Sequence, residues 1–110
     1  EGLDFELNEP APVVKIGIRP GYGKTAELFK ANNRPKVVRV TLNDEHSFDA
    51  ELKDLDEQQE ISVPGYFKPV RKVSLRINEI YRGTRFRDTA LADVVIETRL
   101  SRKPKLRGSR

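Results

Sequence analysis

The fold is decided by residues 73–78, which read Val73-Ser74-Leu75-Arg76-Ile77-Asn78. Apolar and polar side chains alternate, so this segment, extended as a β-strand, presents one apolar and one polar face. The pattern is typical of an antiparallel strand that packs on a core with one side and meets water with the other. The same alternation recurs at residues 3–7, 14–18, 38–42, 48–52, 61–63 and 91–98.

Turn-forming and polar residues separate these segments. Residues 43–46 read Asn-Asp-Glu-His, residues 54–58 are rich in acids, and Pro64 precedes Gly65. Only residues 25–32 show helical character, and their length allows about two turns. Seven short strands with such turns predict an all-β fold, an antiparallel β-sandwich, with one helical turn inside a loop.

The charge of the chain is unevenly distributed. The 110 residues contain 21 Lys and Arg against 17 Asp and Glu, a net charge of +4. Six basic residues and no acid lie from Arg99 to Arg110, so removing those six leaves 15 basic and 17 acidic residues in residues 1–98, a net of −2. We therefore predict one folded domain at residues 1–98 and a basic, disordered tail or linker at residues 99–110.

Several motifs are similar to parts of catalytic or metal sites but lack residues that such sites need. Residues 21–25 (Gly-Tyr-Gly-Lys-Thr) are similar to the end of a phosphate-binding loop, but the first glycine of such a loop would fall on Ile18. The single histidine, His46, lies in a polar turn. The acidic stretch of residues 54–60 lacks the glycine and terminal glutamate of a calcium loop and is expected to be a solvated turn. With no cysteine available either, we expect no enzyme activity, no cofactor and no metal site.

One loop, residues 81–89, gathers two aromatic and three arginine side chains between predicted strands. Guanidinium groups and aromatic rings are groups with which proteins hold sugars, carboxylates and nucleic-acid backbones. A structural role is equally open, in which Tyr81 closes the core, Gly83 supplies a positive φ, and Asp88 bonds to backbone amides. We expect these three residues to be structural and the arginines to be exposed.

The same loop carries a resemblance to a known family. Residues 77–94 follow the pattern Ile77-x-x-Ile80-Tyr81-x-Gly83-Thr84-x-x-x-Asp88-Thr89-Ala90-Leu91-Ala92-Asp93-Val94. Upstream motifs in the same order are Ile18-x-x-Gly21-Tyr22-x-Lys24, Phe29-x-x-Asn32-x-Arg34-Pro35, and Leu52-x-Asp54 followed by Gln59-x-Ile61. From about Gly2 to Ile96, the chain resembles the discoidin-like domain of NAD-glycohydrolase translocation modules. That family is a branch of the galactose-binding-like jelly rolls, related to the coagulation-factor type C domains.

The resemblance implies a jelly-roll sandwich and a non-catalytic accessory module, because NAD hydrolysis belongs to a separate domain. Its structural motif comprises Gly21, Tyr81, Gly83, Asp88, Thr89 and Asp93, the last of which stands where the family usually has Glu. The family's first strand, and a loop with Asn, Asp and Trp, would precede Glu1. The sandwich is therefore expected to lack its N-terminal strand, with an open edge covered by that segment or by another chain. Because the missing region often contributes to the metal face, no calcium site is carried over.

The favoured function is a binding or targeting module that recognises a carbohydrate or a cell-surface partner with loops at one end of the sandwich. The candidate ligand-contacting residues, from three loops, are Tyr22, Lys24, Asn32, Arg34, Arg82, Arg85, Phe86 and Arg87. Two alternatives stay open: an assembly module that docks on a partner chain, and nucleic-acid binding through the basic tail. The acidic body of the domain disfavours nucleic acid. The expected setting is bacterial and extracytoplasmic or in the cell envelope, without a membrane span.

Overall fold

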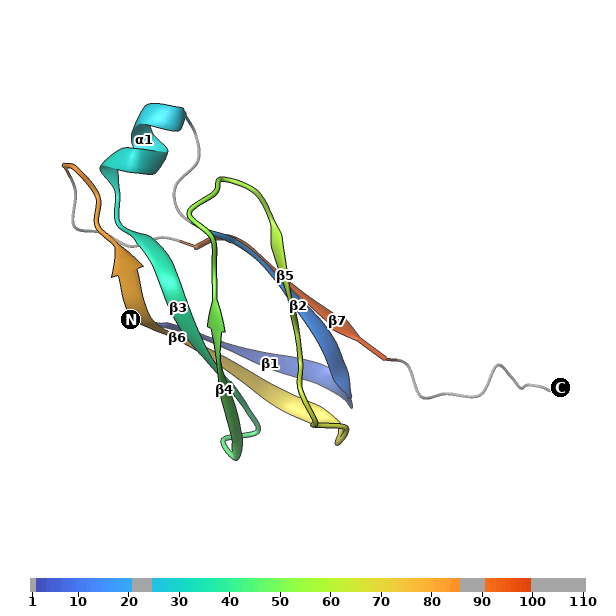
Figure 1. Cartoon of the computed structure of the whole chain (residues 1–110). Coiled ribbons are helices and arrows are strands. Elements are labelled where there is room, and N and C mark those ends of the chain that lie inside the picture. The colour runs from blue at the N-terminus through green and yellow to red at the C-terminus, as the bar shows by residue number, and fades with distance from the viewer. Residues whose placement is uncertain (1, 21–24, 86–90, 100–110) are drawn as a thin grey trace, which may run out of the picture.

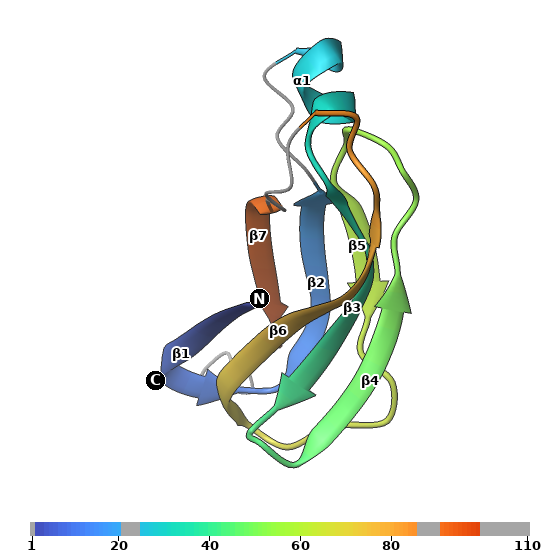
Figure 2. The same ribbon diagram turned by 90° about the vertical axis from the view of Figure 1, so that its left-hand side faces the viewer.

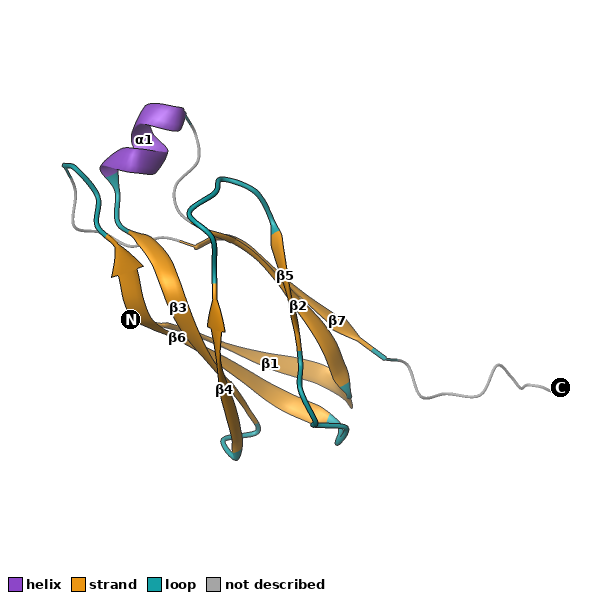
Figure 3. Ribbon diagram, in the orientation of Figure 1, coloured by secondary structure: helices purple, strands orange, loops and turns teal. Residues whose placement is uncertain are grey.

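The computed structural model describes residues 2–20, 25–85 and 91–99. Its elements, in chain order, are β1 (Gly2–Ala11), β2 (Val13–Pro20), α1 (Ala26–Ala31), β3 (Arg34–Leu42), β4 (His46–Glu51), β5 (Gln59–Ser62), β6 (Val70–Tyr81) and β7 (Leu91–Thr98). Strands make up most of the described chain, as Figures 1 and 3 show.

The strands form two antiparallel sheets (Figure 2), which pack as a β-sandwich. The larger sheet has the order β1-β6-β3-β4 and the smaller sheet the order β5-β2-β7. Both sheets contribute to one core, whose fully buried members include Ile16, Ile18, Val38, Val40, Leu42, Val73 and Leu75. The all-β sandwich predicted from the alternating segments is confirmed.

The pairing of β3 with β6 shows why the alternation buries one face. Val40 lies opposite Leu75, and both side chains are fully buried, whereas Arg39 lies opposite Arg76, and both are exposed. Cross-strand partners point to the same face of a sheet. Residues 73–78 therefore supply one wall of the core from β6, while their polar members face water or the sheet surface.

Strand β2 departs from the predicted alternation at its start. In the pairing with β7, Val13 lies opposite Thr98 and Lys15 opposite Glu97, so the register shifts at Val14. Such a bulge inserts one residue and changes which side chain faces the core. As a result Val13 is buried and Val14 is only half-buried, which corrects the prediction that the apolar face of this strand begins at Val14.

Helix α1 begins after Thr25, whose Oγ1 accepts a hydrogen bond of 3.0 Å from the backbone N–H of Leu28. A threonine in this position satisfies one of the free N–H groups of the first turn. The helix ends at Asn32, where the backbone becomes extended (φ −95°). Phe29 and Ala31 are buried, so the short helix is anchored by packing. The predicted helical turn is confirmed.

The two ends of the sandwich have different structures. The α1 end consists of α1 and the loops at residues 32–33, 52–58 and 82–85, and the turn end consists of Pro12 and the turns at residues 43–45 and 63–69 (Figure 1). At the turn end, β4 begins at His46, so this residue opens a strand and does not belong to the preceding turn as predicted. Within the described ranges, no helix has the length and apolar character needed to cross a bilayer.

Candidate functional site

At the α1 end, the loop that follows β6 is bonded to the end of helix α1. The backbone N–H groups of Thr84 and Arg85 donate to the carbonyls of Lys30 and Ala31, at 3.2 and 3.0 Å. These carbonyls belong to the last turn of the helix, where they have no partner within the helix itself. Two predicted loops that are about fifty residues apart in the sequence are thereby joined.

Gly83 makes this close contact possible. Its N–H donates to Asn33 Oδ1 at 2.7 Å, and a Cβ at this position would lie 2.4 Å from both the Ala31 oxygen and the Asn32 carbonyl carbon. The positive φ that the sequence suggested for Gly83 is absent, because Gly65 is the glycine with a positive φ among the described residues. Glycine is needed at position 83 for space and not for its backbone freedom.

Arg34 links several segments of the α1 end through its hydrogen bonds, and we call a side chain with this role a strut. Its Nε and Nη2 donate to the two carboxylate oxygens of Asp54 at 2.8 and 2.9 Å, and its Nη1 donates to the carbonyls of Lys30 and Asn32 at 2.8 and 2.9 Å. The guanidinium lies 5.4 Å from the centre of the Phe29 ring. These hydrogen bonds lower the pKa of the Asp54 carboxyl and raise that of Arg34. A planar fork that is satisfied on both sides fixes the end of α1 to the loop after β4.

The position of Arg34 corrects its predicted role. We expected it among the ligand-contacting residues, but its side chain is 7% exposed and its donors are occupied by Asp54 and by backbone carbonyls. Asn32 is also engaged, because its Nδ2 donates to the Leu28 carbonyl at 2.8 Å. Both residues therefore shape the α1 end from within.

Tyr81 and Asp93 have defined places near this end. The Tyr81 hydroxyl donates to the Leu52 carbonyl at 2.9 Å, which joins β6 to the loop after β4. Asp93 is exposed on β7, opposite Arg19 in the register. Arg19 itself donates to Asp56 Oδ1 at 3.0 Å. Asp54 and Asp56 are thus paired with arginines, so the expected solvated turn is anchored at two points and spans residues 54–58, because β5 begins at Gln59.

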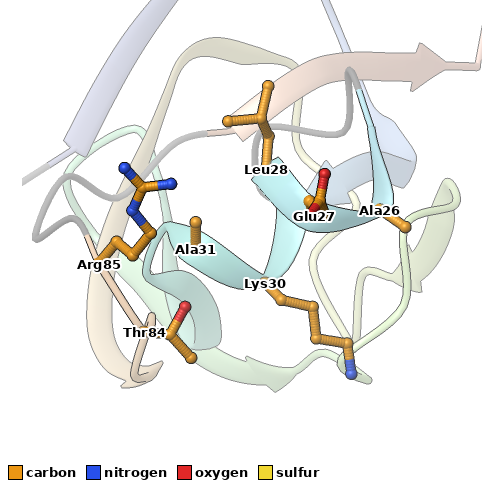
Figure 4. Close-up of a pocket in the computed structure, with 7 residues that line it drawn as sticks. All are labelled: Ala26, Glu27, Leu28, Lys30, Ala31, Thr84 and Arg85. Atoms are coloured by element: carbon orange, nitrogen blue, oxygen red, sulfur yellow. The ribbon is translucent and has the colours of Figure 1, made fainter.

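A groove of about 490 Å³ opens between α1 and the loop after β6. It is lined by Ala26, Glu27, Leu28, Lys30, Ala31, Thr84 and Arg85 (Figure 4). Its charged members are one acid, Glu27, and two bases, Lys30 and Arg85, and all three are exposed. A groove with this lining can offer the ammonium of Lys30 and the hydroxyl of Thr84 beside apolar side chains.

Only some of the predicted ligand-contacting residues lie in the part of the chain that the structure describes. Arg85 lines the groove, and Arg82 is exposed on the same loop. Lys30 and Thr84 also line the groove but are not among the predicted contacts. The remaining predicted residues, Gly21, Tyr22, Lys24, Phe86, Arg87, Asp88 and Thr89, lie outside the described residues.

Comparison with known proteins places the chain in a family. A family model described as the NAD glycohydrolase translocation F5/8 type C domain matches residues 1–97. The chain belongs to this family. The match confirms the resemblance seen in the sequence motifs, and it covers all seven strands except the last residue of β7.

A solved structure supports the same fold. This chain is similar to the NMR structure of the Streptococcus pyogenes NAD+-glycohydrolase translocation domain, with a TM-score of 0.63 and 19% sequence identity. The similarity covers 87% of this chain and 85% of that chain. At this identity it shows a shared fold. No curated protein matches the sequence.

The histidine and two acids of this family member, Asp54 and Asp56, are engaged in structural contacts. His46, the single histidine of the chain, lies at the turn end, where its Nε2 bonds to the Pro64 carbonyl at 3.0 Å and its ring stacks on Tyr66. Among residues 2–20, 25–85 and 91–99, no three His, Cys, Asp or Glu side chains gather in a way that could hold a metal ion.

Proposed function

We propose that this domain is a non-catalytic binding module and that it recognises a carbohydrate or a cell-surface partner through the groove at its α1 end. The observation that carries the proposal is the groove itself, in which exposed donors from two distant segments surround an apolar floor. Its volume of about 490 Å³ lies within the range of about 300–1,000 Å³ that is usual for ligand sites.

The rigidity of the groove supports this proposal. Lys30 and Thr84 stand on backbone segments that are hydrogen-bonded to each other, and the carbonyl of Lys30 also accepts from the buried Arg34. The backbone that carries these donors is therefore fixed before a ligand binds, so its ordering does not reduce the affinity. The hydroxyl groups of a sugar, or carboxylates on a surface, are acceptors that ammonium and hydroxyl donors recognise.

The engagement of the acids supports a non-catalytic role. General acid–base catalysis needs a titratable group within hydrogen-bond reach of the substrate. Asp54 and Asp56 at the α1 end are paired with Arg34 and Arg19. Glu27 is the one acid in the lining of the groove, so the lining holds no pair of carboxylates that could act as acid and base together.

The proposal is tested by binding to a glycan array and to isolated cell-surface polysaccharide. Lys30→Ala and Thr84→Ala are expected to weaken binding, by about tenfold for the charged residue, because hydrogen bonds to charged groups contribute about 1.5–3 kcal/mol. Lys15→Ala is the matched control, since Lys15 is an exposed lysine on β2 away from the groove. Absence of binding to every glycan and surface preparation by the folded domain, or an equal loss in Lys15→Ala, would contradict the proposal.

An assembly module is a second candidate, and Leu3 on β1 is the observation that favours it. Leu3 lies opposite the fully buried Leu75, so it points to the core side of the larger sheet. It is nevertheless 43% exposed, so part of the core side at β1 is uncovered. A partner chain that completes the sandwich would cover it. Light scattering decides this point, because a monomer at all concentrations argues against the assembly role.

A further inference from the structure

A second, smaller pocket lies at the turn end, on the opposite side of the molecule from the groove. It has a volume of about 220 Å³ and is lined by Pro12, Val13, Val14, Val63, Tyr66, Phe67 and Arg99. Phe67 is 77% exposed, which makes it the most exposed large apolar side chain of the described residues. An exposed aromatic ring beside an apolar pocket is a common anchor in protein interfaces.

The loop that presents Phe67 is fixed from both sides. The buried Tyr66 donates its hydroxyl to Glu45 Oε2 at 2.6 Å and accepts from Asn43 Nδ2 at 2.8 Å. Asn43 Nδ2 also donates to the Pro69 carbonyl, and His46 holds the Pro64 carbonyl, at 3.0 Å each. The exposure of Phe67 is therefore enforced by bonds before and after it in the chain. Such a side chain is already in place for a partner.

The charge around this pocket is positive. Arg99 is the only charged residue in the lining, and no ion pair of its guanidinium occurs within the described residues. The nearby acids are already paired, Glu45 with Lys68 at 3.3 Å and Asp44 with Lys72 at 3.4 Å. Because the lining holds Arg99 and no acid, a partner that enters the pocket would be favoured if it brought its own carboxylate.

We propose that this pocket docks an acidic segment of a partner protein. One bulky apolar side chain of the segment fills the pocket beside Phe67, and a neighbouring carboxylate pairs with Arg99. The size of the pocket supports a single side chain, because about 220 Å³ is below the usual range for small-molecule sites. This surface is independent of the groove at the α1 end, so the domain joins two partners at opposite ends.

The test is a selection from a library of random linear peptides displayed on phage, with the full chain as bait. We expect enrichment of peptides that combine a bulky apolar residue with Asp or Glu. Affinity for a selected peptide should fall about tenfold or more in Phe67→Ala and in Arg99→Glu, as for anchor residues of interfaces. Since Phe67 and Arg99 are exposed, both variants should remain folded, and circular dichroism verifies this.

Two controls separate this site from the groove. Leu55→Ala removes another exposed apolar side chain, and Arg82→Glu reverses another exposed base, both at the α1 end. Neither should change the affinity for the selected peptide. Failure to enrich acidic peptides, or unchanged binding by Phe67→Ala, would overturn the proposal. So would self-association, or binding to vesicles with anionic lipid, that Phe67→Ala abolishes while peptide binding is absent, because the occupant would then be a second copy or a membrane.

Discussion

The two ends of the sandwich are fixed by different chemistry. At the α1 end, a buried charged group, Arg34, holds an acidic loop and the end of the helix together. At the turn end, a neutral amide, Asn43, has the corresponding role, since its side chain bonds to Tyr66, Pro69 and the backbone of Arg71. In both cases one polar side chain satisfies several partners that a loop would otherwise leave unpaired.

This difference has consequences for both proposals. A charged strut stabilises the fold when both charged partners are present. Loss of one partner lowers the free energy of unfolding strongly, because the other charge then stays in a site with little water. A neutral strut depends less on pH and salt. We therefore expect the groove at the α1 end to be sensitive to changes of charge at Arg34 and Asp54, and the loop that presents Phe67 to depend on Asn43 together with the hydrogen bond from Tyr66 to Glu45.

The largest effect is expected from Arg34→Met. The variant leaves Asp54 and the Asn32 carbonyl without the Arg34 donor, while the Lys30 carbonyl keeps the bond from the Thr84 N–H, and breaking a buried ion pair costs about 3–5 kcal/mol in the free energy of unfolding. Because the Asp54 side chain is 27% exposed, we expect the lower part of this range. Urea denaturation measures the change.

The control for Arg34 lies on the same strand. Arg39 pairs with Asp49 at 2.9 Å, but both side chains are about half exposed, so Arg39→Met should lower the free energy of unfolding much less than Arg34→Met does. Arg34→Lys keeps the charge and loses the fork, and it should fall between the two. If Arg34→Met and Arg39→Met were equally stable, the comparison between a charged strut and a surface pair would fail.

A smaller effect is expected at the turn end from Asn43→Gly. Asn43 has a positive φ of 54°, which glycine adopts readily, so this variant removes the side-chain bonds while it keeps the backbone conformation. Unsatisfied buried groups cost about 1–3 kcal/mol, and partial exposure here suggests about 2 kcal/mol. Asn43→Ala should lose about 1 kcal/mol more, because alanine is strained at this φ.

Hydrogen exchange would show whether the two ends are independent. In Asn43→Gly, the amide of Arg71, which donates to Asn43 Oδ1 at 2.7 Å, should lose protection. The amides of Thr84 and Arg85, which bond to the end of α1, should keep theirs. A parallel loss at both ends would mean that the sandwich transmits the change and that the ends are not separate.

The strands were predictable because their signal is local. Within residues 73–78, Val73 and Leu75 are fully buried while Arg76 and Asn78 are exposed, so most of the periodicity that the sheet uses is present in the sequence itself. The bulge at Val14 has no such signal, because Val13 and Val14 are chemically identical and only the register with β7 decides which one is buried. The family was also predictable, because four motifs occur in one order and each has a defined spacing.

The candidate site was predictable only in part. The sequence indicates that the segment of Tyr81, Gly83 and Arg85 is unusual, but it could not show that Gly83 faces the backbone at the end of the helix. Nor could it show that Arg34 is buried, because its partner Asp54 is 20 residues away and both lie in segments that look polar and exposed. Contacts between loops depend on how the sandwich brings its ends together, and this information is spread over the whole chain.

The smallest effect concerns the pH dependence of stability and compares Asp54 with Asp49. The bonds from Arg34 hold the pKa of the Asp54 carboxyl below its value of 3.8 in an unfolded chain, so this group stabilises the fold above that pH. The contribution is lost as the pH falls through the lower, folded pKa. In Asp54→Asn the neutral amide can still accept from Arg34 but cannot titrate. The difference in unfolding free energy between the wild type and Asp54→Asn should therefore be constant near neutral pH and shrink below about pH 4.

Asp49→Asn supplies the comparison, since hydrogen bonds from Arg39 also lower the pKa of Asp49, but on the exposed sheet surface. Water and salt screen this pair, so the corresponding difference should be small at every pH and should fall further in high salt. The measurement is urea denaturation of the three proteins at a series of pH values from about 6 to 2. A larger pH-dependent change in Asp49→Asn would contradict the argument that burial makes the Arg34–Asp54 pair more stabilising than the exposed Arg39–Asp49 pair. The contrast between the charged strut of the α1 end and the neutral strut of the turn end would then need another cause.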